Sequence, residues 1–248
     1  MEFHIHCNPE NIARYVFTPG DPERARKIAG RLEEARLISE SRGYLVFTGS
    51  LKGFPMTVCA TNMGGPTTAI ALEELGHMGA DTFIRIGSCG TLQDDITCGD
   101  VIIATGTYRG GGTSLAYLPM AFPAVADFSL TQALVQSAEL SGLPYRLGLG
   151  IARDAFYGPQ DPHLRDTLAG AGILSAEMES DTLFILASLR GWRAGAIYAC
   201  DGTAAEVKPE WGAEAFRQGE KAAIEIALKA MLVIVASDAG RQESRSRP

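Results

Sequence analysis

The sequence predicts an α/β fold, a single-domain three-layer αβα sandwich with a mixed central β-sheet. Apolar, strand-like runs alternate along the chain with segments of helical periodicity. No internal repeat and no linker rich in Pro, Gly or Ser divides the 248 residues, of which 46% are hydrophobic and 21% charged. We therefore expect one domain over residues 1–238 and a disordered polar tail over residues 239–248.

The expected elements follow one another in regular order. The strands are Tyr15–Thr18, Tyr44–Ser50, Met56–Thr61, Thr82–Ile86, Val101–Ala104, Arg146–Ile151 and Ala196–Cys200. The helices are Pro22–Leu37, Pro66–Met78, Leu130–Ser141, Asp181–Leu189 and Ala213–Ala236. Ligands of such folds bind outside the carboxyl ends of the strands, so the turns at those ends are where functional residues are expected.

Charge and cysteine content exclude several classes of protein. A net charge of −7 argues against nucleic acid as a partner. No apolar run is long enough to span a bilayer, and Met1–His4 does not resemble a signal peptide. The five cysteines are scattered without metal-ligand spacing, which fits a reducing compartment. We expect a cytoplasmic protein without membrane or nucleic-acid partners.

The first strand-to-helix turn, Thr18–Arg24, has the character of an anion site. Asp21 is a good N-cap and Pro22 suits the first helical position, so free N–H groups follow Gly20. Arg24 lies in the first helical turn, where the helix dipole disfavours a cation unless an anion shares the site. The alternative is an ordinary capped helix with a solvated arginine.

Two further glycine turns repeat this arrangement. Asn62–Pro66 runs from strand through glycines to helix, a weak signal by itself. Arg85 closes an apolar strand, and burying it is costly unless it meets an anion. Gly87 and Ser88 then let the backbone approach that anion and donate to it. A third glycine run, at 110–112, has no helix directly behind it and is interpreted as a mobile loop.

Three later features each have a structural and a functional interpretation. Glu177 and Glu179 flank Met178 just before a helix, either as acidic capping or as a carboxylate that grips vicinal hydroxyls. Asp201 ends an apolar strand, either as a turn residue or as an acid or base. Phe156 precedes a turn, either in the core or facing the same crevice.

These motifs, in this order, resemble the nucleoside phosphorylase family that includes uridine phosphorylase and the hexameric purine nucleoside phosphorylases. The match covers the Pro-Gly-Asp-Pro turn with Arg24, the Met-Gly-Gly-Pro turn, Arg85-Ile-Gly-Ser and Glu-Met-Glu-Ser, and it runs from about His4 to the last helix. The resemblance implies phosphorolysis of ribonucleosides to free base and ribose 1-phosphate, with inorganic phosphate as co-substrate and no cofactor.

The resemblance also implies roles for single residues. The implied phosphate site is Gly20, Arg24, Arg85 and Ser88, completed by Arg42 of a neighbouring subunit. The implied ribose contacts are His4 (reaching across the dimer interface), Met178 and Glu179, and the implied base contacts are Phe156, Gln160 and Asp201. Borrowed residues imply a dimer as the active unit, assembled into a hexamer. Arg85 and Asp201 are the expected catalytic residues.

The sequence signals for base preference disagree, because some favour uracil and others favour purines. Segments 112–115 and 122–128 look like uridine phosphorylase, but Pro162 stands where those enzymes have an arginine two residues after Gln160. Arg165 is nearby but out of register with that missing arginine. Asp201 aligns with the aspartate that purine enzymes use to protonate N7, but its partner arginine further along is not evident, and Lys208 is the candidate substitute. We expect a slight purine preference, with uridine phosphorylase as the alternative.

Two other classes and the question of a metal stay open at this point. A nucleoside hydrolase would lack the phosphate arginines, and a non-catalytic nucleoside-binding protein would not need Asp201, Glu179 and Arg85 together. Gly43 follows Arg42 where uridine phosphorylases have a glutamate that helps to hold a monovalent cation, so no metal is expected.

Overall fold

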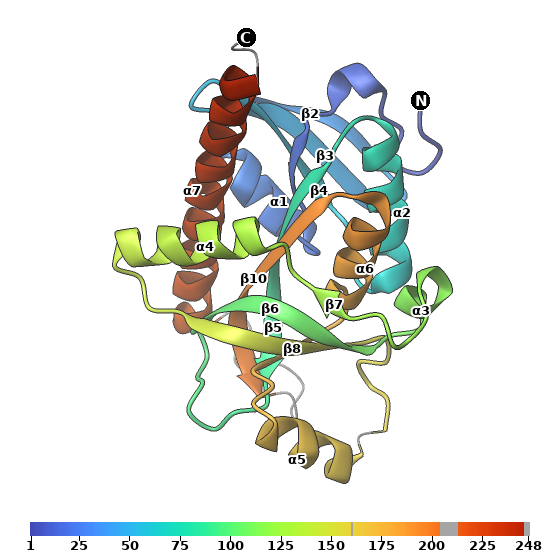
Figure 1. Cartoon of the computed structure of the whole chain (residues 1–248), viewed down its shortest axis with the longest axis vertical. Helices are drawn as coiled ribbons and strands as arrows, with labels where there is room; N and C mark the ends of the chain where they lie inside the picture. The colour runs from blue at the N-terminus through green and yellow to red at the C-terminus, as the bar shows by residue number, and fades with distance from the viewer. Residues whose placement is uncertain (160, 204–212, 246–248) are drawn as a thin grey trace.

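The computed structural model describes residues 1–159, 161–203 and 213–245, and within them one mixed sheet of ten strands (Figure 1). The strands are β1 (Tyr15–Phe17), β2 (Glu33–Ser41), β3 (Tyr44–Leu51), β4 (Phe54–Ala60), β5 (Thr82–Thr91), β6 (Val101–Gly110), β7 (Ala124–Val125), β8 (Arg146–Arg153), β9 (Ser175–Glu177) and β10 (Arg193–Thr203). Their order is β10-β6-β8-β9-β5-β1-β4-β3-β2, with β7 beside β6. Every strand expected from the sequence is present.

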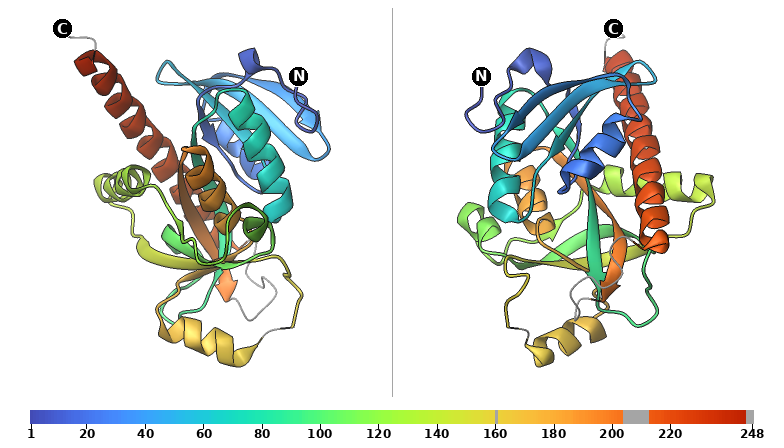
Figure 2. Two further views of the ribbon diagram at one scale, coloured as in Figure 1. Left: turned by 45° about the vertical axis from the view of Figure 1, so that its right-hand side comes forward. Right: turned by 180° about the vertical axis from the view of Figure 1, so that it is seen from behind.

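Helices cover both faces of the sheet and give the expected three layers (Figures 1 and 2). They are α1 (Pro22–Ala29), α2 (Gly65–His77), α3 (Thr113–Tyr117), α4 (Phe128–Ser141), α5 (Pro162–Gly170), α6 (Ser180–Arg190) and α7 (Glu214–Arg245). Phe83 of β5 packs in a core with α2 and α6, whereas its neighbour Ile84 packs in a second core with α1, α4 and α7. Successive residues of a strand face opposite sides, so one buried strand serves both cores.

One half of the sheet closes on itself. β10 pairs in parallel with β5 and antiparallel with β6, and β8 and β9 complete the circuit back to β5. The other half, β1-β4-β3-β2, stays open. Since β9 joins the carboxyl end of β5 through Gly90 and Ala176, the closure brings the start of α6 to the edge where Arg85 lies.

Several expected boundaries differ from the structure. Strands β5 and β6 continue past the expected ends at Ile86 and Ala104 to Thr91 and Gly110, because further pairing with neighbouring strands extends them. The helix expected over residues 22–37 ends at Ala29, and Glu33–Ser41 forms strand β2 against β3, because pairing with a distant strand outweighs local helix preference. Helix α7 continues to Arg245, so most of the expected tail is helical. The expectation that no helix directly follows the glycine run at 110–112 is wrong, because Gly110 ends β6 and α3 begins at Thr113.

No helix within the described residues is long and apolar enough to cross a membrane. The described residues also contain no group of three or more His, Cys, Asp or Glu side chains placed to hold a metal ion. The expectation of no metal stays a prediction.

Arg109, near the end of β6, is a buried arginine that organises the segment after it. Its Nη1 donates to the carbonyl oxygens of Pro119 (2.6 Å) and Phe122 (2.7 Å). Its Nη2 donates to those of Ser114 (2.8 Å) and Leu118 (2.7 Å), and its Nε donates to Ser114 Oγ (3.2 Å). One side chain thus donates to four backbone carbonyls, two of which, those of Ser114 and Pro119, also accept a backbone N–H.

We expect Arg109→Met to lower the free energy of unfolding by about 3 kcal/mol, because these carbonyls lose donors in a buried region. Urea denaturation followed by circular dichroism measures the change. Arg146→Met is the control, since Arg146 forms an exposed ion pair with Asp95 and its loss should cost under about 1 kcal/mol. Equal losses in both variants would contradict the role given to Arg109.

Candidate active site

Parallel strands carry the predicted turns to one edge of the sheet. β1 lies between β4 and β5 and runs parallel to both. The turns that follow β1 and β4, Thr18–Arg24 and Asn62–Gly64, therefore gather at the carboxyl edge beside the second half of β5. Ser88, expected in a turn, lies within β5 there. The chain approaches itself closely there, because a Cβ atom on Gly20 would lie 3.0 Å from the carbonyl oxygen of Asn62.

Arg85 is buried at the centre of this edge. Its Nε donates to Glu177 Oε2 at 2.9 Å, and its Nη2 forms a very short ion pair with Glu179 Oε2. Its Nη1 is buried and has no hydrogen-bond partner within the described residues. A Cβ atom on Gly20 would lie 3.7 Å from that Nη1. A buried, unpartnered cationic donor beside a glycine backbone is the chemistry of an oxyanion site.

The two carboxylates around Arg85, those of Glu177 and Glu179, accept hydrogen bonds from different segments of the chain. Glu177 caps α6, because it accepts the backbone N–H groups of Glu179 and Ser180 at 3.0 Å and the Ser180 hydroxyl at 2.6 Å. Glu179 Oε1 accepts the N–H of Gly64 at 2.5 Å, which ties the second glycine turn to the site. The capping interpretation is therefore confirmed for Glu177. The interpretation of Glu179 as a carboxylate that binds vicinal hydroxyls stays a prediction.

Burial and charge set the protonation of these groups. Burial acts to lower the pKa of Arg85, but Glu179 and Glu177 outweigh it and hold that pKa above its ordinary value. Burial raises the pKa of Glu179 to about 7, against the charge of Arg85, which lowers it, and with Glu177 adding to the rise. A carboxyl group whose pKa lies near neutral pH, within a cluster of polar groups, is typical of functional sites.

Arg24 is buried and held in place, so its alternative as a solvated arginine is wrong. Its Nε donates to Glu220 Oε1 of α7 at 2.8 Å, and its Nη1 donates to the carbonyl of Ile86 at 3.3 Å. Asp21 caps α1 as expected by accepting the N–H of Glu23 at 3.0 Å. Because Ile86 follows Arg85 directly, the two arginines approach the same edge.

Ser88 and Asp201 lie on neighbouring strands at this edge. Ser88 of β5 pairs with Ala199 of β10, and Cys200 of β10 lies opposite Cys89. Asp201 follows Cys200 and is 1% exposed. The strand pairing thus places the predicted acid two residues beyond the partner of the predicted phosphate-binding serine. Met178 lies between the two site glutamates in the turn before α6.

The residues expected at the base are less completely defined. Phe156, between β8 and α5, is 40% exposed and packs edge-to-face on Tyr157 at 4.9 Å between ring centroids. Gln160 and Lys208 lie outside the described residues. Arg165 is a surface residue of α5 that contacts Asp166 at 3.3 Å.

His4 and Arg42, the residues expected to serve a neighbouring subunit, form a surface cluster with Phe3. The Arg42 guanidinium lies 4.9 Å from the centroid of the Phe3 ring, and the His4 ring packs edge-to-face on it at 4.8 Å. His4 Nδ1 also contacts Glu74 at 2.6 Å. Arg42 and Gly43 have φ values of +52° and +87° in the two-residue turn between β2 and β3, a conformation unusual for arginine.

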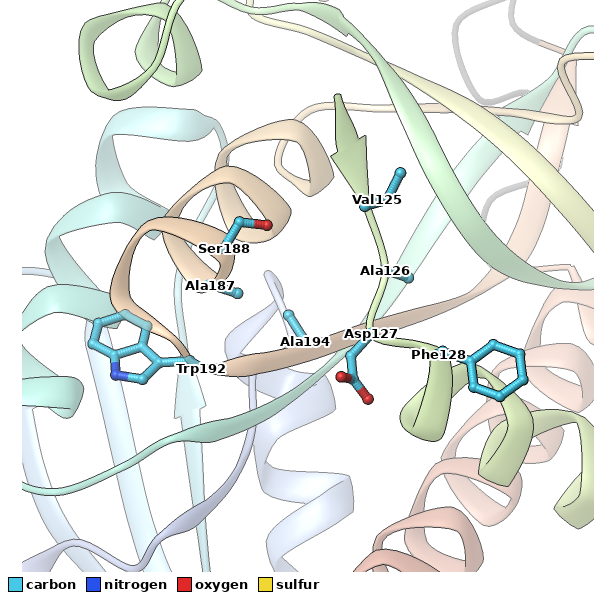
Figure 3. A pocket seen from close by; sticks show the side chains of 8 residues that line it. All are labelled: Val125, Ala126, Asp127, Phe128, Ala187, Ser188, Trp192 and Ala194. Atoms are coloured by element: carbon cyan, nitrogen blue, oxygen red, sulfur yellow. The ribbon is translucent and has the colours of Figure 1, made fainter. Parts of the chain in front are cut away.

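A hollow of about 260 Å³ lies elsewhere on the molecule (Figure 3). Its lining comes from β7, the starts of α4 and β10, and the end of α6, around Trp192 and Ala194. It borders the amino end of β10, opposite to the end that carries Asp201. None of the described residues that line this hollow is a predicted site residue.

The fold and this edge together define a class: an α/β protein that holds buried arginines among the turns at the carboxyl ends of its strands. Residues 14–236 match the family model of the phosphorylase superfamily. The chain belongs to this superfamily, and its relatives place it among the nucleoside phosphorylases, which are pentosyltransferases.

Several proteins named uridine phosphorylase are similar over nearly the whole chain. That of Thermococcus kodakarensis is 42% identical over 100% of this chain and 91% of its own, and that of Treponema pallidum is 39% identical over 97% and 96%. A guanosine phosphorylase of Halorubrum lacusprofundi is 38% identical over 80% and 82%. The crystal structure of uridine phosphorylase from Vibrio fischeri superimposes with a TM-score of 0.87 at 34% identity, covering 92% of this chain and 95% of that one.

Proposed function

We propose that the protein catalyses the reversible phosphorolysis of uridine to uracil and ribose 1-phosphate. The observation that carries phosphorolysis is the buried Nη1 of Arg85 beside Gly20, which has no hydrogen-bond partner among the described residues and calls for an oxyanion. The choice of uridine rests on the relatives named uridine phosphorylase, at 35–42% identity. These relatives do not support the purine preference expected from Asp201.

The proposed chemistry uses positioning and charge. Phosphate attacks the anomeric carbon while the base departs, so positive charge develops on the ribose ring beside the phosphate held by Arg24 and Arg85. The Glu179 carboxylate accepts from the ribose 2′- and 3′-hydroxyls. The proposed set is Gly20, Arg24, Arg42, Arg85 and Ser88 for phosphate, His4, Met178 and Glu179 for ribose, and Phe156, Gln160 and Asp201 for the base.

A dimer is the proposed active unit, with a hexamer as the assembly. His4 and Arg42 both contact Phe3, which is 65% exposed, so the two residues proposed for donation lie in one accessible cluster. A single contact surface around Phe3 would deliver both to a neighbouring site. Arg42 also sits on a tight two-residue turn, which fixes the base of its side chain.

Purine nucleosides are the second candidate, because Asp201, proposed to contact the base, is a buried carboxyl and one relative is named guanosine phosphorylase. A purine N7 takes up a proton as the base leaves, whereas uracil offers no equivalent acceptor for Asp201.

A nucleoside panel with and without phosphate tests both candidates. We expect phosphate-dependent release of uracil from uridine, with kcat/KM for inosine and guanosine at least about tenfold lower. Faster cleavage of inosine or guanosine would replace uridine by purines as the substrate class. Base release at the same rate without phosphate would indicate a hydrolase, and no product from any nucleoside would indicate a non-catalytic binding protein.

A further inference from the structure

The two buried arginines of the site are held in the same way. The Nε of Arg85 donates to Glu177, and the Nε of Arg24 donates to Glu220, each time to a buried carboxylate from a distant element. Glu177 belongs to the motif that precedes α6. Glu220 lies on α7, 196 residues after Arg24, and belongs to no motif that the sequence distinguishes.

We propose that Glu220 is a positioning residue for phosphate binding, which acts by fixing the guanidinium of Arg24. The proposal rests on the proposed function, in which Arg24 contacts phosphate. Glu220 is assigned no contact with phosphate, because two negative charges repel each other; its two oxygens accept from Arg24 Nε at 2.8 Å and from Lys27 Nζ at 2.5 Å.

Two contacts fix the plane of the Arg24 guanidinium. Nε is held by Glu220 and Nη1 by the carbonyl of Ile86 at 3.3 Å. A planar group bonded through two of its nitrogens has no free rotation, so its remaining donors keep one direction. The Ile86 carbonyl is part of β5, so Arg24 is oriented relative to Arg85 on the same strand.

The negative charge of Glu220 is needed as well as its shape. Arg24 and Lys27 are three residues apart on α1, so their side chains lie on one face and repel each other. Glu220 lies between them and contacts both. Burial acts to raise the pKa of Glu220, but Lys27 and Arg24 outweigh it and keep that pKa below its ordinary value, so the carboxylate stays ionised at neutral pH.

Glu220→Gln tests the proposal, because it keeps the size of the side chain and removes its charge. We expect the KM for inorganic phosphate to rise about tenfold while the KM for uridine changes less than about twofold. Lys27→Met should change the phosphate KM in the same direction but by less. Glu225→Gln on the same helix is the matched control, since it breaks a more exposed ion pair with Lys229 (3.0 Å) and should leave both constants unchanged.

A double-mutant cycle with Arg24→Ala separates positioning from general stability. If Glu220 acts through Arg24, Glu220→Gln has no further effect on the phosphate KM in the Arg24→Ala background. A rise of the same size in both backgrounds, or equal changes in the two KM values, would overturn the proposal. Should Glu220→Gln fail to fold, Glu220→Asp carries the same test.

The result is distinguishable from failure of the proposed function. If the wild-type protein needs no phosphate to release the base, phosphorolysis is wrong. Calorimetric titration of inorganic phosphate into the wild-type protein and Glu220→Gln then still tests Glu220. About tenfold weaker binding in the variant supports the positioning role, and equal binding, or none in either protein, overturns it.

Discussion

Arg85→Met should abolish phosphate-dependent cleavage and lower the free energy of unfolding by about 3–5 kcal/mol. The guanidinium neutralises Glu177 and Glu179, all three groups being buried, so its loss leaves two facing carboxyl groups without a cation. It also removes Nη1, the donor proposed to face phosphate. We expect kcat/KM to fall by at least about a thousandfold.

Arg85→Lys separates the two effects. A lysine keeps the positive charge but lacks the planar fork that reaches both glutamates and phosphate together. This variant should recover most of the stability in urea denaturation while the KM for phosphate stays at least about tenfold raised. Wild-type phosphate saturation in either variant would refute the assignment of Arg85 to the phosphate site.

Glu179→Gln should lower kcat/KM for uridine by about a hundredfold, because an amide replaces a carboxylate that accepts from ribose hydroxyls. The loss should be smaller for 2′-deoxyuridine, which lacks one of those hydroxyls. Arg85 keeps its contact with Glu177, so the variant should fold. Steady-state kinetics on the two nucleosides measure the difference.

The pH profile gives an independent test of Glu179. With a pKa of about 7, its carboxyl takes up a proton as the pH falls through neutrality, loses its charge and accepts more weakly. The kcat/KM of the wild-type protein for uridine should therefore fall as the pH falls from about 8 to about 6, whereas Glu179→Gln, which cannot titrate there, should lack this step. An identical step in both proteins would assign it to another group.

Much of the fold follows from local sequence. Strands such as Thr82–Ile86 are short apolar runs, and helices such as α2 begin after glycine turns with proline in the first turn. These signals depend on near neighbours, so single-sequence patterns contain them. The anion site proposed at Arg24 and Arg85 also rests on local signals, since Arg24 lies in the first turn of a helix and Arg85 in an apolar run.

What local sequence missed depends on residues that are far apart. Strand β2 exists because it pairs with β3, although Glu33–Leu37 continues a helical pattern. The partial closure of the sheet depends on β10 meeting both β5 and β6. The partner of Arg24 on α7 has no signature in its own segment, where Glu220 looks like one more charge on a long helix.

The sequence by itself thus determined the α/β class, the turns around the candidate site and the arginines that are proposed to face an anion, because each depends on patterns within about ten residues. Only the tertiary structure decided which carboxylate holds which arginine, and that Nη1 of Arg85 is left without a partner within the described residues. Those outcomes depend on the burial and distance of groups that are 92 to 196 residues apart in the chain. Charge pairing in a low-dielectric interior is set by such distances, and no local pattern specifies them.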